Sequence, residues 1–148
     1  MISVLCLILR VALGGFYAAS GWMKLMAPTE KFAATIAQYD FVSGPLAEIA
    51  TYGVPWAEFL GGLYLILGLR TAGALRILWA LNTAFILILT QALVRNLPIR
   101  DCGCFGQKMT LTPEQTLMLD LVTWALFLLL HWQLKNTRKL SLDTLLDR

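Results

Sequence analysis

The sequence predicts an all-α integral membrane protein: a four-helix bundle with a short interfacial helix between spans 1 and 2. Of its 148 residues, 58% are hydrophobic and 14% are charged, whereas soluble domains are about 45–50% apolar and about 25% charged. The apolar residues are gathered in four runs near the roughly 20 residues that a spanning helix needs. This length fits one domain, residues 1–148, and the composition excludes a disordered or fibrous chain.

The first span is expected over residues 2–26, where Arg10 and Lys24 are the charged residues. Its apolar stretch is longer than that of a signal peptide, and it has neither a basic start nor a clear cleavage site. We therefore expect this segment to be retained as a membrane helix.

A shorter helix is expected in the connection that follows. Thr29 stands where an N-cap residue would satisfy free backbone donors. Phe32, Ile36 and Tyr39 then recur at i, i+4 and i+7, which places them on one helix face. Such a helix is predicted to lie in the membrane interface.

The remaining spans are expected over residues 49–69, 72–94 and 114–134, with a tail at 135–148. Four spans place both termini on one side of the membrane. That side and the short second connection carry six basic residues, against five on the other side. The positive-inside rule then favours cytoplasmic termini and a cytoplasmic tail, and it places the connection before the fourth span in the periplasm.

This last connection contains Cys102-Gly103-Cys104. Two thiols separated by one glycine can form a disulfide if the backbone bends tightly, and glycine tolerates such a bend best. Arg100 and Lys108 flank the pair, and nearby positive charge favours the reactive thiolate. On an oxidising face, the motif indicates an exchangeable dithiol, with Cys102 and Cys104 as candidate catalytic residues.

Other interpretations of this motif stay open. The two cysteines could form a purely structural clip, or an exposed cysteine could carry a lipid. A metal site is not expected, because structural zinc needs four ligands and His131 lies toward the opposite end of the fourth span. Cys6, within the first span, is expected to be a packing residue.

Polar residues inside the spans form a second candidate site. Counted from the side of the termini, Arg10, Glu58 and Asn82 lie at similar depths of roughly 12–16 Å. We expect an Arg10–Glu58 ion pair with Asn82 as its hydrogen-bonding neighbour. This intramembrane cluster could either fix which helix faces which or take part in chemistry.

Three further charged residues are expected nearer the outer face, as possible support for the cysteines. Asp120 lies about a turn and a half into the fourth span. It is expected to pair with Lys24 or Arg95 at the membrane boundary, or to manage protons for the thiols.

The motifs resemble those of a known family. The Arg10-x3-Gly14-Gly15-Phe16 and Pro55-Trp56-x-Glu58 elements are similar to the first two spans of the DoxX-like membrane proteins. The Cys102-Gly-Cys-Phe-Gly106 element resembles, more narrowly, the MauE branch, the methylamine utilisation proteins. The resemblance covers roughly the first 110 residues.

The resemblance implies a four-helix bundle in the bacterial inner membrane. MauE proteins are associated with maturation of the disulfide-rich small subunit of periplasmic methylamine dehydrogenase, alongside a thioredoxin-like partner. Some DoxX relatives are subunits of quinone-reducing enzymes, which makes quinone the one cofactor to consider. Only Cys102 and Cys104 carry over from the family by motif.

The leading hypothesis is a membrane-embedded thiol–disulfide relay. Its partners would be the lipid bilayer, a periplasmic thioredoxin-like protein and a disulfide-containing client. No nucleic-acid partner is expected, because the basic residues form no stripe. The alternatives are a non-catalytic assembly factor, a quinone-linked oxidoreductase subunit and a small-molecule transporter, although four spans without an internal repeat are unlike many transporters.

Overall fold

The computed structural model describes residues 1–41, 43–99, 111–133 and 142, and the described part is all-helical. The tail from residue 134 onward lies outside it, apart from residue 142. The helices, in chain order, are α1 (Ile2–Met26), α2 (Thr29–Gln38), α3 (Pro45–Leu67), α4 (Thr71–Val94) and α5 (Pro113–Trp132).

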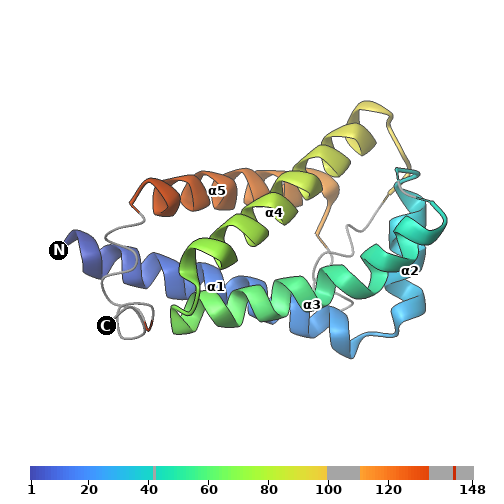
Figure 1. The fold of residues 1–148 in the computed structure, drawn as a ribbon. Helices are drawn as coiled ribbons and strands as arrows, with labels where there is room; N and C mark the ends of the chain where they lie inside the picture. The colour runs from blue at the N-terminus through green and yellow to red at the C-terminus, as the bar shows by residue number, and fades with distance from the viewer. Residues whose placement is uncertain (42, 100–110, 134–141, 143–148) are drawn as a thin grey trace.

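The long helices alternate in direction along the chain. In Figure 1, α1 and α3 run side by side in opposite directions, α4 crosses above them, and α5 returns toward the end where the chain begins. The short helix α2 lies at the other end of the molecule, near the C-terminal end of α1. The end of α4 and the start of α5 are at that same end, so the connection that carries the cysteine motif is anchored there.

The helix bounds agree closely with the predicted spans 2–26, 72–94 and 114–134. The helix expected over 49–69 begins earlier, at Pro45, because Gly44 adopts a positive φ of 64° as the N-cap. Proline at the first helical position then starts the helix without the loss of a backbone hydrogen bond.

Among the described residues, three helices are long and apolar enough to cross a membrane: α1, α4 and α5. The helix α3, with 23 residues, is also long enough to cross a membrane but is not among these three. The span predicted over residues 49–69 is thus not confirmed as a membrane crossing.

The predicted helix after the first span is confirmed as α2, although its predicted cap is wrong. Thr29 is the first helical residue, and the N-cap is Pro28, which makes no side-chain capping bond. A capping side chain must belong to the residue that precedes the first turn, so Thr29 stands one position too late. None of the α2 residues is buried.

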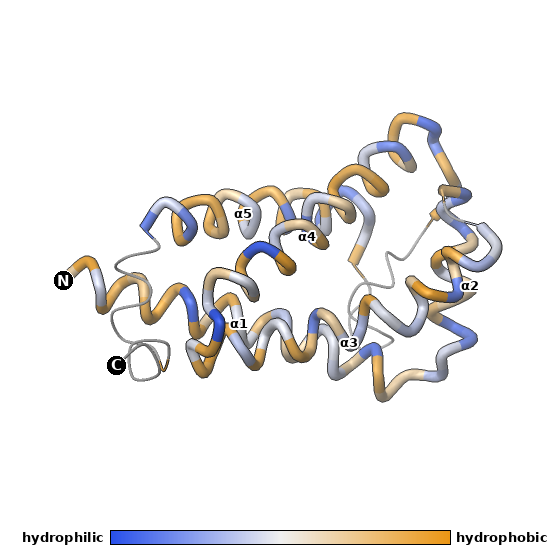
Figure 2. The backbone as a smooth tube through the Cα atoms, viewed as in Figure 1, coloured by the Kyte–Doolittle hydropathy of each residue, from blue (hydrophilic) through white to orange (hydrophobic). Residues whose placement is uncertain are grey.

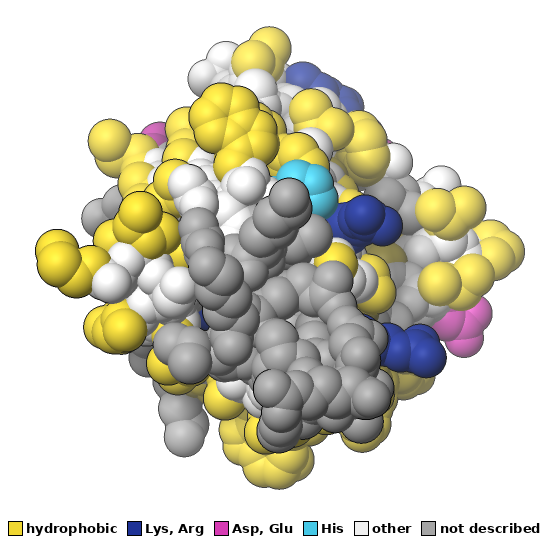
Figure 3. Space-filling model, turned by 60° about the vertical axis from the view of Figure 1, so that its left-hand side comes forward, with side chains coloured by type: hydrophobic (Ala, Val, Ile, Leu, Met, Phe, Trp, Pro, Cys, Tyr) yellow, Lys and Arg dark blue, Asp and Glu magenta, His cyan; other side chains and the backbone are white. Residues whose placement is uncertain are grey.

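The distribution of polar and apolar side chains differs from that in a soluble protein. Hydrophilic positions interrupt otherwise hydrophobic helices in Figure 2, and several of them are turned inward. Large apolar side chains instead face outward around the periphery, as Figure 3 shows from the end that carries the termini. They include Ile8, Trp22, Trp56, Leu87 and Val122. Such a surface fits association with a lipid bilayer.

Glycines set the register of α1 against α3. A Cβ atom built on Gly14 would lie 2.8 Å from the carbonyl oxygen of Gly62, and one on Gly21 would lie 2.7 Å from the carbonyl oxygen of Pro55. The two backbones therefore touch at both positions, which only a residue without a side chain permits. This register decides which polar residues of α3 meet those of α1.

The main core joins four helices near the end that carries the termini. Cys6 is 5% exposed and belongs to this core. The interpretation of Cys6 as a packing residue is confirmed. The other buried members are Leu13, Tyr17, Leu65, Ala74, Leu75, Leu78, Phe127 and Leu130.

Candidate functional site

A buried ion pair joins α1 to α3. The Lys24 ammonium lies 2.6 Å from Oε2 of Glu58, and both side chains are 2% exposed. Lys24 also donates to the Ser20 hydroxyl at 3.0 Å, and that hydroxyl donates to the same Glu58 oxygen at 3.2 Å. Ser20 and Lys24 are four residues apart, so they share one face of α1. The close approach at Gly21 brings this face against Glu58.

Two aromatic rings also face the Lys24 ammonium. The ring centroid of Phe32 on α2 lies 5.9 Å from Nζ, and that of Phe85 on α4 lies 5.4 Å away. At such distances the negative faces of the rings attract a cation. The ammonium is thus held by groups from four helices.

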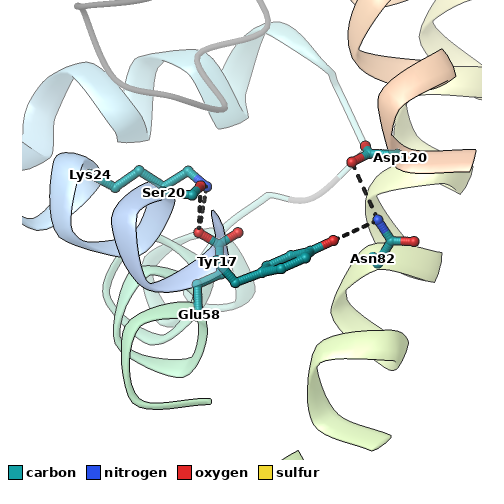
Figure 4. Close-up of polar contacts among 6 residues, drawn as sticks. All are labelled: Tyr17, Ser20, Lys24, Glu58, Asn82 and Asp120. Carbon is teal, nitrogen blue, oxygen red and sulfur yellow. Dashed lines mark hydrogen bonds and ion pairs between the residues drawn. The ribbon is translucent and has the colours of Figure 1, made fainter. Parts of the chain in front are cut away.

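A second polar network connects α1, α4 and α5. Nδ2 of Asn82, a residue with no exposed surface, lies 2.8 Å from the Tyr17 hydroxyl, 3.1 Å from the Thr123 hydroxyl and 3.3 Å from Oδ1 of Asp120. The Thr123 hydroxyl also donates to the Asp120 carbonyl at 3.0 Å. Figure 4 shows how Tyr17 reaches from the α1 side toward Asn82. This network fixes the position of Asp120, which is 9% exposed.

A small cavity lies between the two networks. Its volume is about 20 Å³, which is enough for one water molecule. The cavity is lined by Phe16, Tyr17, Ser20, Lys24, Glu58, Phe85, Thr116 and Asp120. Charged and hydroxyl groups from α1, α3 and α5 therefore line one small cavity of the helix bundle.

The predicted Arg10–Glu58 ion pair is wrong, because Glu58 pairs with Lys24. Gly14 already packs against Gly62 and Ile66, so Arg10, one turn earlier, lies near the C-terminal end of α3. The prediction measured the depth of Arg10 and of Glu58 from the end of each residue's own helix, and so assumed that the two helix ends lie at the same depth. In the structure, α1 begins well beyond the end of α3 (Figure 1). Arg10 is nonetheless buried, with 2% exposure.

The structure separates the other predicted residues. Asn82 bonds the Tyr17 network rather than an Arg10–Glu58 pair. Asp120 shares the cavity with Lys24 but accepts its described hydrogen bond from Asn82. Arg95 lies apart from both and forms an exposed ion pair with Asp40 at 3.1 Å.

Sequence reasoning missed Tyr17, Ser20 and Thr123. A signal was present for two of them, because Tyr17, Ser20 and Lys24 stand at i, i+3 and i+7. This polar stripe runs along one face of an otherwise apolar helix. Thr123 gave no such signal, since a threonine in a membrane helix commonly bonds its own backbone.

Cys102 and Cys104 lie outside the described residues. The chain leaves the described part at Ile99 and returns at Leu111. The α5 helix then starts with a capping box made by two hydrogen bonds. The Thr112 hydroxyl accepts a hydrogen bond from the Gln115 backbone N–H, and the Gln115 side chain accepts one from the Thr112 backbone N–H. This motif fixes the start of α5.

Comparison with known proteins gives one family. No curated protein and no solved structure matches the chain. The family described as methylamine utilisation protein MauE matches residues 2–133. This stretch includes all five described helices and the Cys102-Gly103-Cys104 motif. The chain is therefore a multi-pass membrane protein that belongs to the MauE family, whose role lies in methylamine utilisation.

Proposed function

We propose that this chain is a membrane-embedded thiol–disulfide relay that supports the redox maturation of periplasmic proteins. The observation that carries the proposal is the Cys102-Gly103-Cys104 motif in the connection between α4 and α5. In a methylamine-utilisation setting, the client would be a disulfide-containing subunit of the methylamine dehydrogenase type. The direct exchange partner would be a thioredoxin-like protein.

The chemistry needs no component beyond the two dithiols. A thiolate of the reduced protein attacks one sulfur of the other protein's disulfide, which breaks that bond and forms a mixed disulfide. The second thiol of the attacking pair then attacks the first cysteine's sulfur in the mixed disulfide, which forms a disulfide within that pair and releases the other protein's cysteine as a thiol. One pair leaves oxidised and the other reduced, so two electrons and two protons have been exchanged.

The described helices support this proposal by anchoring the connection at both ends. The Ile99 side follows a small buried core made by Tyr39, Leu89 and Ala92. On the other side, the connection ends at Thr112, whose capping box starts α5. Both ends of the connection are therefore held by the helix bundle.

A quinone is not part of the proposal. Pockets for drug-sized ligands are about 300–1,000 Å³, whereas the cavity beside Lys24 and Asp120 has a volume of about 20 Å³. This cavity is therefore too small for a quinone ring.

We further propose four crossings as one domain of the bacterial inner membrane, with α3 as the fourth span. The termini would be cytoplasmic and the cysteine connection periplasmic. Two features support this: the short basic connection with Arg70 between α3 and α4, and the packing of α3 against α1 along its glycines. Basic residues in short connections favour the cytoplasmic side.

Thiol trapping in intact cells tests both proposals. The Cys6→Ala variant removes the buried cysteine, so that only Cys102 and Cys104 can react with a membrane-impermeant maleimide. Labelling that appears only after mild reduction supports a reducible disulfide on the outer face. Labelling only in lysed membranes would overturn the periplasmic relay.

A second measurement separates the relay from a non-catalytic assembly factor. In a relay, replacing one cysteine leaves the other able to hold a partner in a mixed disulfide. We expect Cys102→Ser or Cys104→Ser to accumulate such a complex, which disappears on reduction. A disulfide that only clips the connection would give destabilised variants and no mixed disulfide.

A further inference from the structure

The small cavity between the two buried polar networks has an unequal charge balance. Glu58 and Asp120 place two carboxyl groups on its wall, and Lys24 places one ammonium there. The other titratable group that faces the cavity is the Tyr17 phenol on α1. The α4 side contributes the uncharged Phe85, and α5 adds the Thr116 hydroxyl.

The two carboxyl groups have very different partners. Glu58 receives the Lys24 ammonium at 2.6 Å and the Ser20 hydroxyl at 3.2 Å. Asp120 receives the neutral amide of Asn82 at 3.3 Å, which is longer than a charge-assisted hydrogen bond of about 2.7–2.9 Å. Among the described residues that line the cavity, Lys24 is the one cation, and it is paired with Glu58.

An ionised Asp120 would leave one negative charge at the cavity without a paired cation among the described residues. A buried charge without a paired partner is strongly unfavourable, and more so where the surroundings are lipid. Neutralisation by a proton removes this cost. The protonated carboxyl can still accept the hydrogen bond from Asn82.

We propose that this cavity is a proton-binding site, in which Asp120 carries the proton while the Lys24–Glu58 pair stays ionised. Release of the proton breaks the O–H bond of Asp120 and passes the proton to a water molecule, for which the cavity has room. Rebinding reverses this step, and no electron moves. The site does not depend on the proposed relay.

Carbodiimide labelling tests the proposal on the purified full-length protein in lipid nanodiscs. The apolar reagent dicyclohexylcarbodiimide reacts with protonated carboxyl groups: its nitrogen takes the proton while the carboxylate oxygen adds to its central carbon. Peptide mass mapping near neutral pH should find the adduct on Asp120 and not on Glu58. The exposed Glu114 in the first turn of α5 is an internal control that should stay unmodified.

Two outcomes of the labelling would overturn the site. Asp120 without adduct would mean that it carries no proton, and equal adducts on Glu58 and Asp120 would mean that the Lys24 pair does not hold Glu58 ionised. The wild-type chain gives this answer, so no variant has to fold.

A matched pair of substitutions gives a second readout. Asp120→Asn replaces a neutral acid with a neutral amide of the same shape, so its Tm should equal that of the wild type. Glu58→Gln leaves the Lys24 ammonium unpaired, so its Tm should fall clearly. An equal loss in both variants would overturn the proposal. Neither measurement involves the cysteines, so failure here leaves the relay standing, and failure of the relay leaves this site standing.

Discussion

Lys24 and Glu58 form a 2.6 Å ion pair between α1 and α3 in which both side chains are almost fully buried. The residues are 34 positions apart in the chain, and the glycine-mediated contact of the two helices brings them together. Because each charge is compensated by the other, a lysine and a glutamate can both lie inside the helix bundle.

Removal of either member of this pair should be strongly destabilising. Lys24→Met and Glu58→Gln each leave one buried group without its partner, at an expected cost of about 3–5 kcal/mol. The double variant should lose less than the sum of the two, because it leaves no unpaired charge. Unfolding of the purified protein in mild detergent measures all three, and strictly additive losses would contradict the pairing.

Substitution of Gly62 should break the contact of α1 with α3. A Cβ atom at this position would lie 2.5 Å from the Ala18 nitrogen and 2.6 Å from the Gly14 carbonyl oxygen. Because both neighbours are backbone atoms, Gly62→Ala must push the helices apart, and Tm and yield should fall. Gly15→Ala is the matched control: a Cβ atom there meets nothing within 4 Å, so this variant should be unchanged or more stable by up to about 1 kcal/mol.

Loss of either cysteine of the motif should abolish function and leave the membrane domain intact. Cys102→Ser and Cys104→Ser remove the exchangeable pair, so a methylamine dehydrogenase-type client should no longer mature. Membrane insertion and Tm should match those of the wild-type chain. Full client maturation in either serine variant would refute the relay.

Asn82 should matter for stability well beyond an ordinary amide. Its Nδ2 group serves the Tyr17 hydroxyl and Asp120 at once, so Asn82→Leu leaves several buried polar groups without a donor. The expected cost is about 1–3 kcal/mol. Thr90→Val is the control on the same helix, because Thr90 is exposed and bonds only its own backbone. Its stability should change by no more than about 0.5 kcal/mol.

Much of the architecture could be predicted from the sequence because local patterns govern it. Runs of apolar residues predicted the helix bounds of α1, α4 and α5 within a few residues, since helix length and lipid solvation depend on the segment itself. The same holds for α2, whose amphipathic period is visible in ten residues. Its cap was missed because a shift of one residue is beyond what propensity resolves.

For the candidate site, the individual residues could be predicted from the sequence, but the contacts between them could not. Glu58, Asn82, Asp120 and Lys24 were each recognisable, because a polar residue inside an apolar helix is costly and needs a partner. Their partners were not recognisable. Depth counted from helix ends had favoured Arg10 for Glu58, and α1 turned out to extend beyond the end of α3.

The order of apolar and polar residues along the chain was enough to identify a helical membrane protein, the segments that form its helices and several of the polar residues that lie inside them. The packing of the helices was needed to show that Lys24, and not Arg10, pairs with Glu58, and that Asp120 shares their cavity. The physical reason is that apolar composition sets where a helix lies, whereas the register between two helices depends on where their backbones can touch. In this protein they touch at Gly14, Gly21 and Gly62.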